Sequence, residues 1–214
     1  MEPFAEARRQ MVATQLRRRG IADERVLDAM SKVPRHRFLP TPDPAAYDDH
    51  PLTIGEGQTI SQPYMVAVMT QALALYGDEG VLEVGTGSGY QAAVLAELCR
   101  QVYSIERIPS LAERARHVLA DLGYRNVEIV VGDGTLGLPG HAPYDGIVCT
   151  AAAPAIPPPW VEQLAEGGRI VAPIGDRWAQ SLVIATKEQG EIKQRHDLGR
   201  VFVPLLGRYG FQEA

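Results

Sequence analysis

The sequence predicts an α/β protein with a mostly parallel, doubly wound sheet, an antiparallel C-terminal edge and an N-terminal helical extension. Between residues 80 and 175, short apolar strands alternate with helical segments, as in right-handed βαβ units. A glycine-rich segment stands between the first of these strands and the next helix. After Gly175 the pattern changes to strands joined by tight turns. A length of 214 residues and a hydrophobic fraction of 45% suit a single compact domain.

Residues 1–78 are expected to form helices and a segment that faces the substrate. The first 33 residues read as two helices, because apolar residues recur at helical spacing. Gly20 should end the first helix, and Asp23 should cap the second. A third helix is expected to begin at Ser61, whose hydroxyl can cap it, and to end at Gly77.

Residues 79–214 are expected to form the sheet and the helices between its strands. The predicted parallel strands are Val81–Gly85, Val102–Glu106, Val127–Val131, Asp145–Thr150 and Arg169–Ile174. The predicted helices are Gln91–Cys99, Pro109–Leu122 and Trp160–Ala165. The C-terminal strands are Ser181–Thr186, Glu191–Asp197 and Phe202–Leu206, with a turn near Gly190 that indicates an antiparallel hairpin.

The glycine-rich segment, residues 81–90, reads Val-Leu-Glu-Val-Gly-Thr-Gly-Ser-Gly-Tyr. Glycines between a strand and a helix allow sharp turns and close approach of the backbone to a ligand. A dinucleotide fingerprint would place its third glycine at position 90, where this chain has Tyr90. The pattern E-x-G-x-G-x-G instead resembles the first motif of Rossmann-like S-adenosylmethionine-dependent methyltransferases. That resemblance implies a cofactor-binding set of Glu83, Gly85, Thr86, Gly87, Ser88 and Gly89.

Two further strand ends agree with this interpretation. Glu106 ends the second strand, where a carboxylate can accept hydrogen bonds from both ribose hydroxyls. Asp133 and Gly134 follow the third strand, where methyltransferases usually hold the adenine amino group. We therefore expect S-adenosyl-L-methionine as the cofactor and S-adenosyl-L-homocysteine as its product.

Composition narrows the possible partners and compartments. A net charge of −5 disfavours a nucleic-acid substrate, and Arg17, Arg18 and Arg19 are expected on the solvated side of a helix. Cys99 and Cys149 form no short-spaced pair, and the five histidines show no metal spacing, so we expect neither a metal nor a disulfide scaffold. No signal peptide or apolar span of membrane length is evident, which predicts a cytoplasmic protein without membrane contact.

Residues 51–66 read Pro-Leu-Thr-Ile-Gly-Glu-Gly-Gln-Thr-Ile-Ser-Gln-Pro-Tyr-Met-Val. This segment resembles the signature of protein-L-isoaspartate O-methyltransferases. The resemblance covers nearly the whole chain and extends to Met11-Val12, Arg19-Gly20-Ile21, Val33-Pro34-Arg35, Phe38-Leu39-Pro40, Asp145-Gly146-Ile147-Val148, Arg169–Gly175 and Phe202-Val203-Pro204-Leu205.

The resemblance implies methyl transfer to the α-carboxylate of L-isoaspartyl residues in damaged proteins and peptides. We expect the chain to act as a monomer. The resemblance places Ser61 at the active site near the acceptor, with Thr59 shaping the same loop. An ionised carboxylate needs no strong general base, so alignment is the main task of the protein. The expected substrate-side residues are Ile60, Gln62, Thr150 and Ala151.

Three alternatives remain open at this stage. A methyltransferase for a small-molecule acceptor would keep the cofactor site but leave residues 51–66 unexplained. A nicotinamide-dependent oxidoreductase would use the same sheet but needs a small residue at Tyr90. A non-catalytic cofactor-binding module would be indicated by loss of Ser61, which is present.

Overall fold

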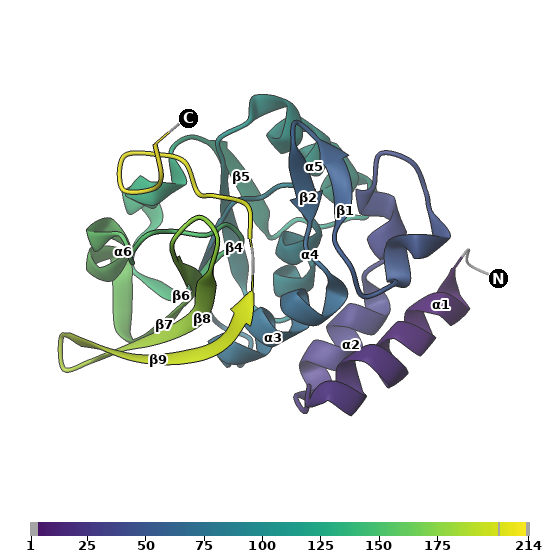
Figure 1. Cartoon of the computed structure of the whole chain (residues 1–214), viewed down its shortest axis with the longest axis horizontal. Helices are drawn as coiled ribbons and strands as arrows, with labels where there is room; N and C mark the ends of the chain where they lie inside the picture. Colours follow the sequence, from purple (N-terminus) through teal and green to yellow (C-terminus); the bar gives the residue numbers. More distant parts are fainter. Residues whose placement is uncertain (1–3, 201, 213–214) are drawn as a thin grey trace.

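A computed structural model describes residues 4–200 and 202–212, and its centre is a seven-stranded sheet in the order β5-β4-β3-β6-β7-β8-β9 (Figure 1). Strands β3 to β7 pair in parallel, whereas β8 and β9 are antiparallel. The predicted doubly wound sheet with an antiparallel edge is therefore confirmed. The strands are β3 (Gly80–Val84), β4 (Gln101–Glu106), β5 (Val127–Val131), β6 (Tyr144–Cys149), β7 (Leu164–Gly175), β8 (Gln180–Glu188) and β9 (Glu191–Arg200).

The strand order reverses beside β3. From β3 the chain steps outward to β4 and β5, and then returns to place β6 on the other side of β3. Loops that leave β3 and β6 at their carboxyl ends therefore diverge in opposite directions. Open α/β sheets bind ligands in the crevice that such a reversal creates.

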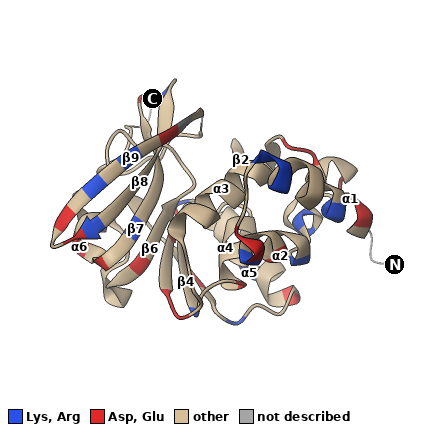
Figure 2. Cartoon of the chain, turned by 90° about the horizontal axis from the view of Figure 1, so that it is seen from below, with Lys and Arg blue, Asp and Glu red and all other residues tan. Residues whose placement is uncertain are grey.

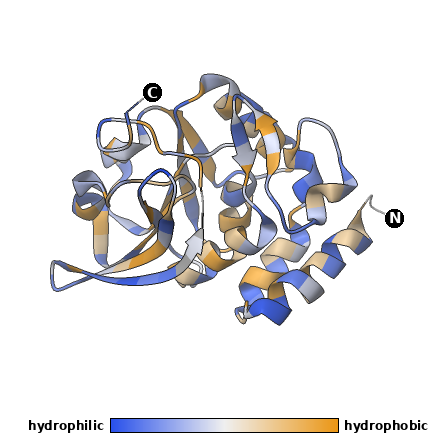
Figure 3. Ribbon diagram, viewed as in Figure 1, coloured by the Kyte–Doolittle hydropathy of each residue, from blue (hydrophilic) through white to orange (hydrophobic). Residues whose placement is uncertain are grey.

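Helices cover both faces of the sheet. Apolar residues of α2 (Glu24–Lys32), α3 (Pro63–Leu73), α4 (Tyr90–Ala96) and α5 (Pro109–Asp121) share one core with one face of the sheet. The other face is covered by α6 (Pro158–Gln163), whose fully buried Trp160 donates its indole N–H to the Gly134 oxygen at 2.9 Å. Several of the central strands between these layers carry hydrophobic, orange segments (Figure 3).

The N-terminal extension packs against the same core as α3 and α4. Helix α1 (Ala5–Gln10) continues through a π-helical segment, η1 (Met11–Leu16), and a 3-10 turn, η2 (Arg17–Arg19). The chain leaves this helix at Gly20, whose φ of 94° is left-handed, as predicted for a helix-ending glycine. Asp23 caps α2 by accepting the Arg25 N–H at 2.9 Å, also as predicted.

Basic and acidic residues are both present along the ribbon of this extension (Figure 2). The three consecutive arginines of η2 are exposed, as predicted, and two of them pair with acidic side chains. Arg17 pairs with Glu24, and Arg19 pairs with Asp49. The short 3-10 turns η3 (Arg35–Phe38) and η4 (Pro44–Tyr47) then lead the chain to the sheet.

The third predicted helix begins close to Ser61, as expected, but it lacks the Ser61 cap and ends earlier than predicted. Its N-cap is Gln62, and no side chain of that residue or of Ser61 caps it. The helix stops at Leu73 because Ala74 adopts a left-handed conformation with a φ of 51°, well before Gly77. Leu75 then points into the core, so the chain turns early to bury an apolar side chain.

The C-terminal prediction was right about the hairpin and wrong about a strand at residues 202–206. Strands β8 and β9 meet at a turn that contains Gly190, with Glu188 opposite Glu191. Residues 202–206 form only isolated bridges. In one of them, Val203 and Leu205 bond to Ala152 on either side of Pro204, and in the other Leu206 pairs with Phe211. Proline has no N–H to extend the pairing.

In residues 4–200 and 202–212, no helix is long and apolar enough to cross a membrane. Cys99 and Cys149 are buried free thiols, and burial raises the pKa of each to about 12.

Candidate active site

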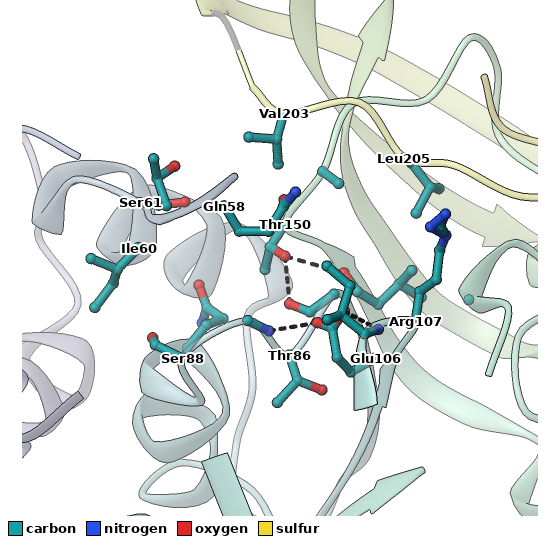
Figure 4. A pocket seen from close by; sticks show the side chains of 18 of the residues that line it. Gln58, Ile60, Ser61, Thr86, Ser88, Glu106, Arg107, Thr150, Val203 and Leu205 are labelled. Atoms are coloured by element: carbon teal, nitrogen blue, oxygen red, sulfur yellow. Dashed lines mark hydrogen bonds between the residues drawn. The ribbon is translucent and has the colours of Figure 1, made fainter. Parts of the chain in front are cut away.

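The glycine loop between β3 and α4 forms the floor of a pocket at the point of strand reversal (Figure 4). Gly85, Gly87 and Gly89 all have left-handed φ angles, of 90°, 53° and 88°. A side chain is strained in that region, so the alternating glycines are a conformational requirement of this loop. The loop closes on itself when Gly89 donates its N–H to the Thr86 oxygen at 2.8 Å.

Glu106 ties the glycine loop to the end of β4. Its Oε2 accepts the Gly87 N–H at 2.8 Å, and its Oε1 accepts the Ile108 N–H at 2.9 Å. The side chain is buried and also lines the pocket. A carboxylate that already accepts one N–H on each oxygen keeps further lone pairs for hydroxyl donors of a ligand.

Thr150, at the end of β6, closes the opposite side of the loop. Its hydroxyl donates to the Gly85 oxygen at 2.6 Å and lies near the Val84 oxygen at 3.3 Å. A Cβ at position 85 would lie 2.5 Å from the Thr150 hydroxyl, so only glycine fits here. Thr150 and Ala151 line the pocket, as predicted from the sequence.

The hairpin of β1 (Leu52–Gly55) and β2 (Gln58–Ile60) covers the pocket from the side opposite β6. Its turn is latched to the start of α5, because Glu56 accepts the Ser110 hydroxyl at 2.8 Å. Arg114 adds a second attachment by donating to the Ile54 oxygen at 2.8 Å. Glu56 thus faces α5, so its carboxylate does not point toward an anionic ligand in the pocket.

Ser61 lies directly after this hairpin and lines the pocket (Figure 4). The helix amide that it was expected to cap is taken by Asp49, whose Oδ1 accepts the Tyr64 N–H at 3.0 Å. Within the described part of the chain, the Ser61 hydroxyl has no hydrogen-bond partner. It is therefore available to a ligand in the pocket.

The C-terminal segment supplies a wall that sequence reasoning missed. Strand β9 points in the same direction as β3, so it ends on the side of the sheet where the pocket lies. The segment Val203–Leu206 then lines the pocket. Backbone hydrogen bonds with Ala152 hold it there, at 2.8 and 2.7 Å. The only signal was the apolar run around Pro204, which had suggested a strand.

Most of the predicted site residues surround this one pocket. Its lining includes Thr59, Ile60, Ser61, Gly85, Thr86, Gly87, Ser88, Glu106, Gly134, Thr150 and Ala151. Four predicted residues do not line the pocket, and each contacts another part of the structure. They are Gln62, Gly89, Asp133 and Glu83. Gln62 donates to Asp49 at 3.2 Å, and Gly89 packs against α5, where a Cβ would lie 3.1 Å from that of Ala115.

Asp133 is another of these four. Its carboxylate accepts the N–H and hydroxyl of Thr135 and, at 2.9 Å, the N–H of Arg208. Burial opposes ionisation of Asp133, but these hydrogen bonds prevail and lower its pKa. The neighbouring Gly134 does line the pocket, and a Cβ there would clash with Val84 at 2.5 Å.

Glu83 is the fourth, and it is fully buried beneath the loop. It accepts a hydrogen bond from Ser104, whose hydroxyl lies 2.5 Å from that of the pocket residue Thr86. Its Oε1 has no partner in the described residues. Burial, and secondarily the Glu106 charge, raises the pKa of Glu83 to about 8, against the effect of the Ser104 hydrogen bond.

The fold and this pocket define a Rossmann-like S-adenosylmethionine-dependent methyltransferase. Residues 7–210 match the family model for protein-L-isoaspartate(D-aspartate) O-methyltransferase, so the chain belongs to that family. The protein-L-isoaspartate O-methyltransferase of Methanoculleus marisnigri is 55% identical over 212 residues, which are 99% of this chain and 96% of the relative.

Two solved structures agree with this membership. A protein-L-isoaspartate O-methyltransferase superposes with a TM-score of 0.87 at 30% identity, covering 95% of this chain and 67% of that one. A Plasmodium falciparum protein in complex with S-adenosyl-L-homocysteine gives 0.82 at 26% identity, covering 93% and 98%. No group of three or more potential metal ligands occurs among the described residues.

The buried acid generates a prediction about stability. Between pH values of about 4.5 and about 8, folded Glu83 retains a proton that the unfolded chain has lost. The unfolded state then binds fewer protons, so rising pH lowers the free energy of unfolding, by up to about 1.4 kcal/mol per pH unit. Glu83→Gln removes this group, and its stability relative to the wild type should rise steadily from pH 5 to pH 8 in urea unfolding.

Glu162→Gln, on the exposed surface of α6, is the matched control and should show no such trend. Parallel pH profiles for the wild type and Glu83→Gln would contradict the prediction.

Proposed function

We propose that this chain transfers the methyl group of S-adenosyl-L-methionine to the α-carboxylate of L-isoaspartyl residues in damaged proteins and peptides. The observation that carries the proposal is the two-sided pocket. A glycine loop with a buried carboxylate lies on one side, and an unpartnered Ser61 hydroxyl lies on the other. Family membership and the cofactor product bound to the Plasmodium falciparum relative support it.

The two parts of the chain would form different sides of the site. Residues 1–78 would supply the acceptor side through the β1–β2 hairpin and Ser61, and residues 79–214 would supply the cofactor side. One hydrophobic core contains residues of both parts, among them Met30, Met69, Val94 and Val171. We therefore expect them to fold as a single unit.

The lining fits the chemical groups of the cofactor. We propose that Glu106 accepts the ribose hydroxyls, while the apolar Ile105, Ile108 and Leu205 flank the adenine near Gly134. The backbone of residues 85–88 lines the pocket and would hold the methionine part. Glu83, Gly89 and Asp133 would act by fixing the shape of the loop and of the C-terminal wall.

The acceptor side is suited to orienting an anion. The hydroxyls of Ser61 and Thr59 can donate to the acceptor carboxylate and point one of its oxygens at the cofactor. When bound, the sulfonium of the cofactor supplies an activated methyl group and departs as a thioether. The pocket lining between these hydroxyls and the glycine loop offers no histidine, and an ionised carboxylate requires no proton acceptor.

Partners and compartment follow from the same observations. We propose a cytoplasmic monomer that acts on neither nucleic acid nor membranes. Two buried free thiols are compatible with a reducing compartment. Acidic and basic residues are interspersed along the ribbon in Figure 2, which favours a protein substrate over a polyanion.

The direct test of the function uses labelled S-adenosyl-L-methionine and two synthetic peptides that differ only in one linkage. The isoaspartyl peptide should gain a base-labile methyl ester, and the peptide with a normal aspartyl linkage should remain unlabelled. Equal labelling of both peptides, or labelling of neither, would refute the assignment of the acceptor.

Ser61→Ala is predicted to lower kcat by about tenfold to a hundredfold, since one or two charge-assisted hydrogen bonds to the acceptor are lost. The affinity for S-adenosyl-L-homocysteine, measured by calorimetry, should stay within about twofold because Ser61 belongs to the acceptor side. Thr14→Ala, on the exposed surface of the N-terminal helical segment, is the control and should leave kcat unchanged. A parallel loss of cofactor affinity in Ser61→Ala would place this side chain on the cofactor side instead.

Glu106→Ala is predicted to weaken S-adenosyl-L-homocysteine binding by at least about tenfold, because hydrogen bonds to a carboxylate contribute about 1.5–3 kcal/mol each. It also removes the acceptor of the Gly87 N–H. Glu113→Ala, on the exposed surface of α5, should bind like the wild type. Calorimetry that gives the same affinity for Glu106→Ala and the wild type would remove Glu106 from the cofactor site.

A further inference from the structure

Two aromatic side chains stand out as almost fully exposed, Trp178 at 83% and Tyr76 at 85%. They lie at opposite ends of the parallel strands. Tyr76 precedes β3, whereas Trp178 sits in the turn after β7, which runs parallel to β3 through β6. Trp178 is therefore at the carboxyl ends of the strands, where the pocket lies, and Tyr76 is at their amino ends. Single exposed apolar residues are common on protein surfaces, so its position beside the pocket, rather than its exposure alone, distinguishes Trp178 from Tyr76.

The turn that carries Trp178 adjoins the pocket wall. Gly175, the last residue of β7, donates its N–H to the Ala153 oxygen at 3.1 Å, two residues beyond the pocket residue Ala151. Gln180, the first residue of β8, accepts the Phe202 N–H at 2.9 Å, next to the pocket residue Val203. Both ends of the turn are thus fixed to segments that line the pocket.

The turn itself is held by several contacts. Asp176 accepts the N–H groups of Trp178 and Ala179, both at 2.7 Å, and these hydrogen bonds lower the pKa of its carboxyl. Arg177 donates to the Gln212 oxygen and lies over the Phe211 ring at 5.1 Å. An exposed indole on a rigid turn can bind a partner with little loss of conformational entropy.

We propose that Trp178 is a docking platform for the polypeptide that flanks the isoaspartyl residue in the pocket. This inference rests on the proposed function, under which the acceptor is part of a chain that must leave the pocket at its rim. Isoaspartyl damage is a property of the backbone and occurs in many sequences. An indole suits such a substrate, because it packs against many side chains and its N–H can bond to any backbone carbonyl.

The kinetic test compares two acceptors, a twelve-residue peptide without tryptophan and a blocked isoaspartyl dipeptide. Trp178→Ala should raise the KM of the long peptide by about tenfold, as for loss of one aromatic contact of about 1.4 kcal/mol. The kcat of the long peptide and the KM of the dipeptide should not change. Trp178→Phe should restore most of the lost affinity, and Tyr76→Ala is the matched control with unchanged constants.

A binding measurement is independent of turnover. The chain has two tryptophans, and Trp160 is fully buried, so acrylamide quenching of fluorescence reports Trp178. The long isoaspartyl peptide with S-adenosyl-L-homocysteine should reduce this quenching at least about twofold, and the blocked dipeptide should not.

The inference would be overturned if Trp178→Ala left the KM of the long peptide unchanged, or if the long peptide did not protect Trp178 from quenching. Methyl transfer by the wild type would still uphold the proposed function in that case. If the wild type methylates neither acceptor, the proposed function fails, and the quenching measurement alone then decides whether a peptide docks here. A wild-type dimer that Trp178→Ala converts to a monomer, seen by light scattering, would assign the indole to a second copy of the chain and overturn the inference.

Discussion

The Glu106 carboxylate joins the two loops that leave the centre of the sheet. One oxygen holds the Gly87 N–H of the glycine loop, and the other holds the Ile108 N–H at the start of the α5 segment. Because Glu106 ends β4 and Gly85 follows β3, this single side chain sets the spacing of the two loops across the strand ends. A buried carboxylate whose two oxygens each accept one backbone N–H stays fixed, and its remaining lone pairs offer a ligand with paired hydroxyl groups a preorganised acceptor.

On the acceptor side of the pocket, one residue caps helix α3 and a different residue faces the ligand. Asp49 accepts the Tyr64 N–H and thereby caps α3 from outside the helix. Arg19 in turn pairs with Asp49, so the N-terminal extension supports the cap. Ser61 is consequently free of a structural role and can face the pocket. The extension thus contributes to the site without lining it, because it releases the hydroxyl that the pocket uses.

Features that depend on short stretches of sequence were predictable. The strands β3, β4 and β5 and the loop between β3 and α4 follow from apolar runs and from alternating glycines, and Glu106 follows from its place at a strand end. Tertiary contacts decided the rest. The cap of α3 comes from Asp49, fifteen positions before Tyr64, and no local rule selects it over Ser61. Asp133 is bound by the Arg208 N–H, 75 positions away, so its position relative to the pocket could not be read from its own neighbourhood.

The C-terminal wall shows the same limit. An apolar run around Pro204 is compatible with a strand, and the position of Ala152 after β6 determines that Pro204 instead forms an isolated bridge beside the pocket. Its place beside the glycine loop follows from β9 being the last strand of the sheet, which is a property of the whole topology.

The most direct measurement is a crystal structure of the chain with S-adenosyl-L-homocysteine and an isoaspartyl peptide. The ribose hydroxyls should bond to Glu106, and the isoaspartyl α-carboxylate should accept the Ser61 hydroxyl at about 2.7 Å, with its other oxygen facing the sulfur. A carboxylate bound away from Ser61, or a ribose away from Glu106, would contradict the two-sided pocket as the site of methyl transfer.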